Sequence, residues 1–314
     1  MPNYTYPFRG IHHIERTTAV PLRRYSVTAD ILSFRRCARQ YGNEAVHGYQ
    51  PSRTSQFFYG TVIHQVLDRA HSHFHGLIDA STNGTLPTDA DIETYFVDVS
   101  QSLRARGIRG ARPQVEQQAL KVVQLFNQVE GPTVYPRVVD TEHRMQAIEG
   151  SFVLHGIVDL LVAATDSDHG PASLEIWDYK SSRRPTGSDF RLTDYRFQMM
   201  VYAELYRRRH GVFPVRAQLY FMNELLVQSR SAAANRRHAL LTVELSEPDV
   251  VEAVRSFTDS VAAIEDCRIA DLWPAPDIGR GPGADTCIIC DFRWNCPTVR
   301  GDSHLSARMP LRFP

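Results

Sequence analysis

The chain has no run of 18 apolar residues, so its sequence predicts no transmembrane helix and no membrane partner. Its first residues lack the basic and then apolar layout of a secretory signal, and we therefore expect a cytoplasmic location. Its 35 basic and 35 acidic residues balance, which excludes a global attraction to nucleic acid and leaves only local arginine clusters to hold such a partner. The composition, 43% hydrophobic and 22% charged, is typical of a folded globular protein.

Lysine is nearly absent. The basic residues include only two lysines, Lys121 and Lys180, so arginine supplies almost all of the positive charge. Lys180 ends the apolar run SLEIWDYK, two residues after Asp178. An ammonium is a compact charge whose pKa shifts readily, whereas a guanidinium is a wide and always charged fork, so the two do not interchange easily at a reactive site. The exception indicates chemistry at position 180.

Cysteine is scarce and odd in number, which argues against a disulfide framework in a cytosolic chain. The five are Cys37, Cys267, Cys287, Cys290 and Cys296, and the last three form a C-x-x-C-x₅-C cluster. Three thiolates within ten residues indicate a metal site that needs one more ligand. Zinc and a 4Fe–4S cluster both accept four thiolates, and the spacing alone does not separate them.

The periodicity predicts an α/β protein with a helical front, a strand-rich centre and a loop-rich tail. Three parts follow from this order: a helical part over 1–132, a strand-rich core over 133–266 and a cysteine-rich tail over 267–314. Helices are predicted over 29–41, 56–75, 92–105, 114–128, 189–209 and 247–264. Strands are predicted as a three-strand meander over 135–180, and then over 215–222 and 239–243.

Two carboxylates and a lysine are predicted to meet at one end of the meander. Asp159 lies in GIVDLLV and Asp178 in EIWDYK, on neighbouring strands, and the strand period of two puts Asp178 and Lys180 on one face. Carboxylate oxygens suit Mg²⁺ or Mn²⁺, and such an ion with a lysine suits phosphodiester hydrolysis. The plainer reading is an ordinary ion pair at a strand end, because D-x-K alone is a weak signal.

These runs resemble the core of the PD-(D/E)XK nucleases, in particular the RecB-type branch. Gln198 and Tyr202 in FQMMVYAELY resemble the Q-x-x-x-Y motif of that branch, which lies beside the active site and contacts DNA. His64 in GTVIHQVLD resembles its G-x-x-x-H helix, whose histidine ligates the metal. Glu142 in DTEHRM corresponds to an acid one strand before the first aspartate, and we expect it to support the site from outside the metal shell.

The resemblance implies a restriction-endonuclease-like mixed sheet flanked by helices. It implies a metal held by His64, Asp159, Asp178 and the backbone carbonyl of Tyr179. The catalytic residues that it implies are Asp159, Asp178, Lys180, Gln198 and Tyr202. By contrast, His71 and His75 lie too far along the same helix to share an ion with His64, and we expect them to be structural or surface residues.

The cysteines resemble those of iron–sulfur RecB-type nucleases of the AddB and CRISPR-adaptation kinds, which have one upstream cysteine and a terminal C-x-x-C-x₅-C. Cys37 in LSFRRCARQY matches the upstream position. The resemblance implies a 4Fe–4S cluster on Cys37, Cys287, Cys290 and Cys296 that joins the helical front to the tail, with structural zinc as the alternative. Cys267 is then a buried free thiol.

We therefore expect a metal-dependent DNA exonuclease that acts on single-stranded DNA or free ends, in repair, recombination or defence. No G-x-x-x-x-G-K-[ST] occurs, so a motor would have to come from a helicase partner. Three alternatives stay open: an end-trimming nuclease beside a CRISPR integrase, a catalytically silent DNA-binding subunit, and a zinc-stapled structural protein. Phe34, Tyr41 and Tyr59 could stack on bases, although core packing is the commoner role of such residues.

Overall fold

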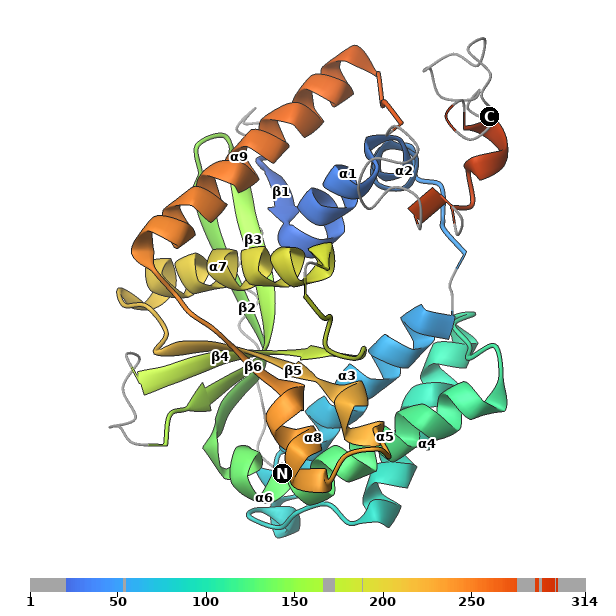
Figure 1. The fold of residues 1–314 in the computed structure, drawn as a ribbon, viewed down its shortest axis with the longest axis vertical. Helices are drawn as coiled ribbons and strands as arrows, with labels where there is room; N and C mark the ends of the chain where they lie inside the picture. Colours follow the sequence, from blue (N-terminus) through green and yellow to red (C-terminus); the bar gives the residue numbers. More distant parts are fainter. Residues whose placement is uncertain are drawn as a thin grey trace, which may run out of the picture.

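The chain folds around a mixed β-sheet with helices on both faces (Figure 1). The computed structural model describes residues 21–52, 55–165, 173–187, 189–275, 286–287, 290–296 and 298. The sheet in this part consists of β1 (Arg23–Ser26), β2 (Val138–Glu149), β3 (Phe152–Ala163), β4 (Leu174–Lys180), β5 (Arg216–Phe221) and β6 (Leu240–Val243). β1 pairs with β3 and β4 with β5 in parallel, and the other pairs are antiparallel. The predicted mixed sheet flanked by helices is confirmed.

The predicted meander is the centre of the sheet. β2 and β3 form a long hairpin, joined by a short turn in which Gly150 has a φ of +53°, a conformation that suits glycine. β4 then pairs antiparallel with the end of β3. The hairpin rises steeply from the plane of β4 and β5, so its two ends meet different helices (Figure 1).

Two helical layers cover the sheet, each over its own hydrophobic core. On one face lie α7 (Phe190–His210) and α9 (Glu247–Ala270), which pack against each other and over the hairpin. The other layer contains α3 (Ser55–Phe74), α4 (Asp89–Ala105), α5 (Pro113–Val129), α6 (Gly131–Val134) and α8 (Ala232–Ala239). Local signals fix the ends: Thr88 and Asp91 form a capping box on α4, and Gly211 ends α7 with a left-handed backbone. Among the described residues, no helix is long and apolar enough to cross a membrane.

The N-terminal segment differs from the prediction of one helix over 29–41. It is divided into the π-helical turn η1 (Val27–Leu32), α1 (Ser33–Arg36), α2 (Ala38–Tyr41) and a second π-helical turn, η2 (Gly42–Val46). The break falls at Cys37, whose backbone is extended and whose sulfur accepts a hydrogen bond from the backbone N–H of Gln40 at 3.3 Å. The cysteine therefore acts as the cap of α2, which explains why the helix cannot run through it.

The end of α9 returns to this segment. Trp273 is fully buried, and a Cβ built on Gly42 would lie 2.4 Å from its ring, so only glycine leaves room for the indole there. The backbone N–H of Arg39 also donates to the carbonyl of Pro274 at 3.1 Å. The three-part division stays a prediction, although β1, from the first part, pairs with β3 in the second. Most of the predicted tail over 267–314 lies outside the described residues.

Candidate active site

One face of α3 forms the wall of an open cleft of about 510 Å³. The spacing of four residues between Gly60, His64 and Asp68 puts them on one side of the helix. A Cβ on Gly60 would lie 3.2 Å from the Ser181 hydroxyl, so this glycine lets α3 pass close to the end of β4. The cleft is lined by Gly60, Thr61, His64, Gln65, Asp68 and Glu142.

Three ligand-type side chains converge at the cleft: His64, Glu142 and Asp159 each offer an atom, and these atoms lie within 4.8 Å of one another. His64 Nδ1 is 3.3 Å from Asp159 Oδ1. Glu142 lies across the hairpin from Asp159, since the residue pairs on either side are in register, and its φ is +48°. Facing carboxylates repel, and a left-handed glutamate is strained. One nitrogen and two carboxylates form a donor set that a divalent cation fits.

Asp159 lies where β3 passes from one core to the other. Val158 packs in the core beneath α7, whereas Leu160 packs in the core beneath α3. The Asp159 carboxylate accepts a hydrogen bond from the backbone N–H of Tyr179 at 2.6 Å, which ties it to β4. The change of face at this residue brings its side chain to the junction of the two helical layers.

The electrostatics of the cleft follow from these neighbours. Burial lowers the pKa of His64, but the Asp159 carboxylate and the hydrogen bond to it outweigh burial and raise the pKa to about 9. Burial raises the pKa of Asp159, and the His64 charge more than offsets it, so the net direction is down. Burial, with repulsion from Asp159, raises the pKa of Glu142. A bound cation would replace the His64 proton as the balancing charge.

Asp178 and Lys180 form an ion pair on the α7 side of β4. The Lys180 Nζ lies 2.6 Å from Asp178 Oδ2. It also donates a hydrogen bond to Gln198 Oε1 at 2.7 Å. Burial raises the pKa of Asp178 despite the lysine, so Asp178 and Asp159 shift in opposite directions. Two carboxylates whose pKa values are driven apart are typical of acid–base sites.

Gln198 and Tyr202 support this pair from α7. The Gln198 amide donates to Asp178 Oδ1 at 2.9 Å and to the Tyr202 hydroxyl at 3.0 Å. Gln198 is 3% exposed, and both of its polar ends are engaged within the site. The motif thus contacts the acid and the lysine, and its expected contact with DNA stays a prediction. The ring of Tyr195, one helical turn earlier, lies 4.4 Å from the lysine ammonium.

The structure thus brings His64, Asp159, Asp178, Lys180, Gln198 and Tyr202 into one region, as the sequence predicts. Their roles stay predictions, and so does metal ligation by the Tyr179 carbonyl. Glu142, expected outside the metal shell, offers an oxygen within 4.8 Å of the ligand atoms of His64 and Asp159. Sequence reasoning missed Tyr195, although the i, i+3 spacing from Tyr195 to Gln198 could have revealed it. Asp178 lies outside the three-ligand group, because its oxygens face Lys180 and Gln198.

The other predicted side chains lie in the core. His71 is buried and lies 3.2 Å from the Tyr179 hydroxyl, and His75 lies 3.1 Å from a backbone carbonyl, which agrees with structural roles. Tyr41 and Tyr59 are buried, so packing accounts for both better than base stacking does. Phe34 is partly buried against the same core as Tyr41.

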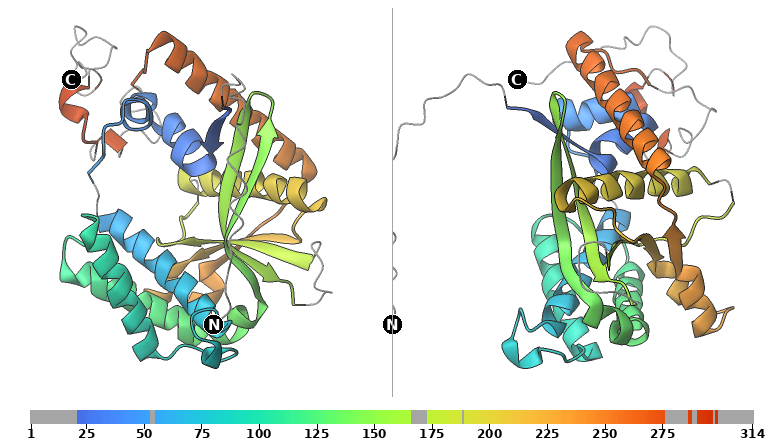
Figure 2. Two further views of the ribbon diagram at one scale, coloured as in Figure 1. Left: turned by 180° about the vertical axis from the view of Figure 1, so that it is seen from behind. Right: turned by 90° about the vertical axis from the view of Figure 1, so that its left-hand side faces the viewer.

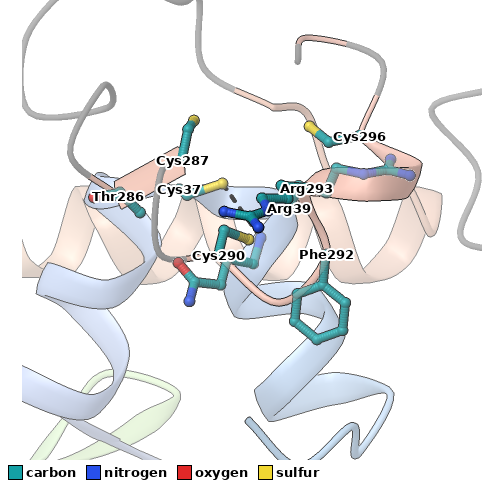
Figure 3. Close-up of a pocket in the computed structure, with 9 residues that line it drawn as sticks. Cys37, Arg39, Thr286, Cys287, Cys290, Phe292, Arg293 and Cys296 are labelled. Carbon is teal, nitrogen blue, oxygen red and sulfur yellow. Dashed lines mark hydrogen bonds between the residues drawn. The ribbon is translucent and has the colours of Figure 1, made fainter. Parts of the chain in front are cut away.

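The four cysteines of the predicted cluster line one pocket, between α2 and the C-terminal residues (Figure 3). They are Cys37, Cys287, Cys290 and Cys296. Burial raises the pKa of the Cys37 thiol to about 11. Within the described residues, no three of the sulfur atoms lie close enough together to share one metal ion. The 4Fe–4S cluster stays a prediction. Cys267 lies within α9 as a free, partly buried thiol, not the fully buried one expected.

Comparisons with known proteins agree with this geometry. Residues 25–297 match the model of the PD-(D/E)XK nuclease superfamily. The fold is similar to a crystal structure from Eubacterium rectale named "Putative exonuclease", with a TM-score of 0.51 and 12% identity over 93% of this chain and 90% of that one. It also matches the structure of SSO0001 with a TM-score of 0.33 and 14% identity, over 85% of this chain and 96% of that one. No curated protein matches the chain.

Proposed function

The chain belongs to the PD-(D/E)XK nuclease superfamily, and we propose that it is a metal-dependent DNA exonuclease of the RecB type that prefers single-stranded DNA. One observation carries the proposal. Lys180 is held between Asp178 and Gln198 at the end of β4, beside the carboxylate of Asp159. An ammonium fixed next to one buried and one partly buried carboxylate suits the neutralisation of a phosphodiester during attack by water.

The proposed metal ligands are His64, Asp159, Asp178 and the Tyr179 carbonyl, with Glu142 added because of its position beside His64 and Asp159. A divalent cation held there would supply Lewis acidity at a phosphate oxygen and lower the pKa of a water molecule. Carboxylate oxygens suit Mg²⁺ and Mn²⁺, and the imidazole nitrogen favours the softer Mn²⁺. We therefore expect activity with both ions and tighter binding of Mn²⁺.

The protein's own groups supply the remaining steps. The Lys180 ammonium has three N–H donors; Asp178 and Gln198 engage two of them, which leaves one for a phosphate oxygen or for the attacking water. Gln198 keeps the acid and the lysine at a fixed separation, because its amide bonds to both. Tyr202 fixes the amide in turn by accepting a hydrogen bond from its nitrogen.

The proposal includes a 4Fe–4S cluster on Cys37, Cys287, Cys290 and Cys296. Their shared pocket supports it, since Cys37 lines the same pocket as three cysteines that lie about 250 residues later in the chain. The link from Cys37 to Cys287 would close a loop of about 250 residues, a large restriction of the unfolded chain. A brown colour and an absorption band near 400 nm would distinguish the cluster from colourless zinc, and iron and zinc analysis would settle the identity.

The deciding experiment is cleavage of end-labelled single-stranded and duplex DNA with Mg²⁺ or Mn²⁺, using protein purified without oxygen. Wild type should release short products from an end, and Lys180→Ala should not. Lys121→Ala is the matched control, because the exposed Lys121 is the chain's only other lysine and lies on α5. If wild type and Lys180→Ala bind DNA but neither cuts it, the chain is a silent binding subunit. If both cut equally, Lys180 is not catalytic.

The biological setting is a further part of the proposal. We place the enzyme in the cytoplasm, where cysteines stay reduced. These 314 residues contain no G-x-x-x-x-G-K-[ST] loop, so the proposal assigns any helicase motor to a partner, and a CRISPR integrase is the second candidate partner. Co-purification with either would assign the pathway, and the second partner would favour end trimming during CRISPR adaptation.

A further inference from the structure

The upper part of the sheet has one uncovered face. Helices α7 and α9 lie on one side of the hairpin, and in the right-hand view of Figure 2 no helix of the described part of the chain covers the other side of its upper part. The side chains on that other side are all exposed or partly exposed, whereas their neighbours in sequence, such as Tyr25, Met145 and Leu154, are buried. We call this surface the open sheet face. Its members are Arg24, Ser26, Arg144, Gln146, Ile148, Val153, His155 and Ile157.

The register of the strands sets the order of these residues. Arg24 lies beside Val153, and Arg144 lies beside Ile157, with His155 between them on β3. Alternate residues of β3 continue from Val153 to Asp159, six residues further on, which at the usual rise spans about 20 Å. The open sheet face therefore leads along β3 to the acidic cleft.

Two arginines, Arg24 and Arg144, give the strand positions of the open sheet face a positive charge. The guanidinium groups of Arg24 and Arg144 have no hydrogen-bond or ion-pair partner among the described residues. Arg23, the neighbour of Arg24, points to the opposite side and pairs with Glu265 of α9. The strand positions of this face carry no acid before Glu142 and Asp159, and the nearest carboxylate at its other end is that of Asp30, which accepts a hydrogen bond from the Ser26 hydroxyl at 3.0 Å.

We infer that the open sheet face binds a single DNA strand on its way to the acidic cleft. Phosphates would pair with Arg24 and Arg144, and bases would lie against the aliphatic side chains of Ile148, which is 69% exposed, and Val153. A strip of three strands is about 10 Å across, a width that suits one strand of DNA better than a duplex. This inference rests on the proposed function, because it assigns the path of the substrate of that same site.

Binding, measured apart from cleavage, tests the inference. A labelled oligothymidine and a duplex of equal length would be titrated by fluorescence anisotropy into full-length Lys180→Ala protein at several salt concentrations. In this background, Arg24→Glu and Arg144→Glu should each weaken single-strand binding on the order of tenfold. Each lost phosphate contact should also reduce the slope of log affinity against log salt concentration by about 0.7. The matched control is Arg255→Glu on α9, whose exposed arginine pairs only with Glu252, and it should change binding less than twofold.

The outcomes separate the two proposals. Equal binding by all three variants, with unchanged melting curves, would overturn the open sheet face as the path. If the arginine variants lose affinity for the duplex alone, the assignment of a single DNA strand to this face is overturned. If Arg24→Glu and Arg144→Glu weaken binding while wild-type protein cuts no DNA under any metal condition, the binding face stands and the proposed nuclease function fails.

Discussion

The contact between Tyr195 and Lys180 predicts a specific effect of substitution. The ammonium lies 4.4 Å from the ring centroid, and the lysine side chain is only 13% exposed. A cation–π contact ranges from about 0.5 kcal/mol at exposed sites to about 2 kcal/mol when desolvated, and this burial indicates the upper half of that range. If the contact aims the ammonium, its loss should lower the rate of the chemical step by about 8- to 30-fold.

Tyr195→Leu removes the ring face, and Tyr195→Phe keeps it. We expect the kcat of the leucine variant to fall by the factor given above for loss of the Tyr195–Lys180 contact. Its KM for DNA should stay within about twofold of wild type, because the tyrosine acts through the lysine. The phenylalanine variant should stay near wild type. Single-turnover cleavage of end-labelled DNA measures the chemical step directly, and DNA binding by anisotropy reports the affinity.

A double-mutant cycle makes the test strict. In a Lys180→Ala background, Tyr195→Leu should have no further effect on the residual rate, since the group that it positions is gone. Two results would refute the reasoning: a leucine variant as active as the phenylalanine variant, or a leucine effect that persists at full size without the lysine. The second result would assign Tyr195 to general packing, where it also contacts Phe221.

Three further predictions concern the metal, acid stability and packing. Glu142→Gln should weaken Mn²⁺ binding on the order of tenfold by calorimetry, because it replaces one of three converging ligands, a charged carboxylate, by a neutral amide, and unchanged affinity would exclude Glu142 from the site. Burial lowers the pKa of His71 to about 3, so as pH falls below about 6.5 the unfolded chain takes up a proton at this residue and the folded chain does not. Between pH 7.5 and 5 the free energy of unfolding should therefore fall by about 2 kcal/mol more for wild type than for His71→Gln, as measured by denaturant unfolding. Gly42→Ala forces a methyl group into Trp273 and should lower the free energy of unfolding by about 1–3 kcal/mol in the same assay, and an unchanged value would contradict that packing.

The elements with a strong repeating pattern could be predicted from the sequence. α3, α4, α5 and α7 begin and end within about three residues of the predicted ranges, and the hairpin turns at Gly150 as the E-G-S signal indicates. Such features depend on neighbours three or four residues apart, which the sequence displays directly. The meeting of Asp159, Asp178 and Lys180 followed from the same logic, since strand order and a period of two were sufficient.

Features set by distant parts of the chain were beyond this reasoning. β1 is the four-residue run RRYS, which has no alternation strong enough to identify it and forms by pairing with β3 more than a hundred residues later. The run AAANRRHA of α8 has little apolar periodicity of its own, and it was missed. The helix expected over 29–41 breaks because the Cys37 sulfur caps α2, a role that its local sequence does not reveal.

The different surroundings of the two aspartates were also hidden. The sequence predicts Asp178 as a metal ligand equal to Asp159, but the side-chain positions differ. Asp159 faces His64 and Glu142, whereas Asp178 is engaged by Lys180 and Gln198. The difference comes from the change of face along β3 at Asp159, and from the left-handed backbone of Glu142. Neither is encoded in a local pattern, because glutamate rarely adopts that conformation without outside support.

The geometry around position 180 also accounts for a lysine in a chain that otherwise uses arginine. The nitrogen of Lys180 lies 2.6 Å from Asp178 Oδ2, 2.7 Å from Gln198 Oε1 and 4.4 Å from the centre of the Tyr195 ring. A point charge with three rotatable donors can satisfy an acid, an amide and a ring from one atom and still offer a proton to a substrate oxygen. A planar guanidinium would spread the same charge over a wider fork and would displace either the amide or the ring. The site therefore requires the compact cation.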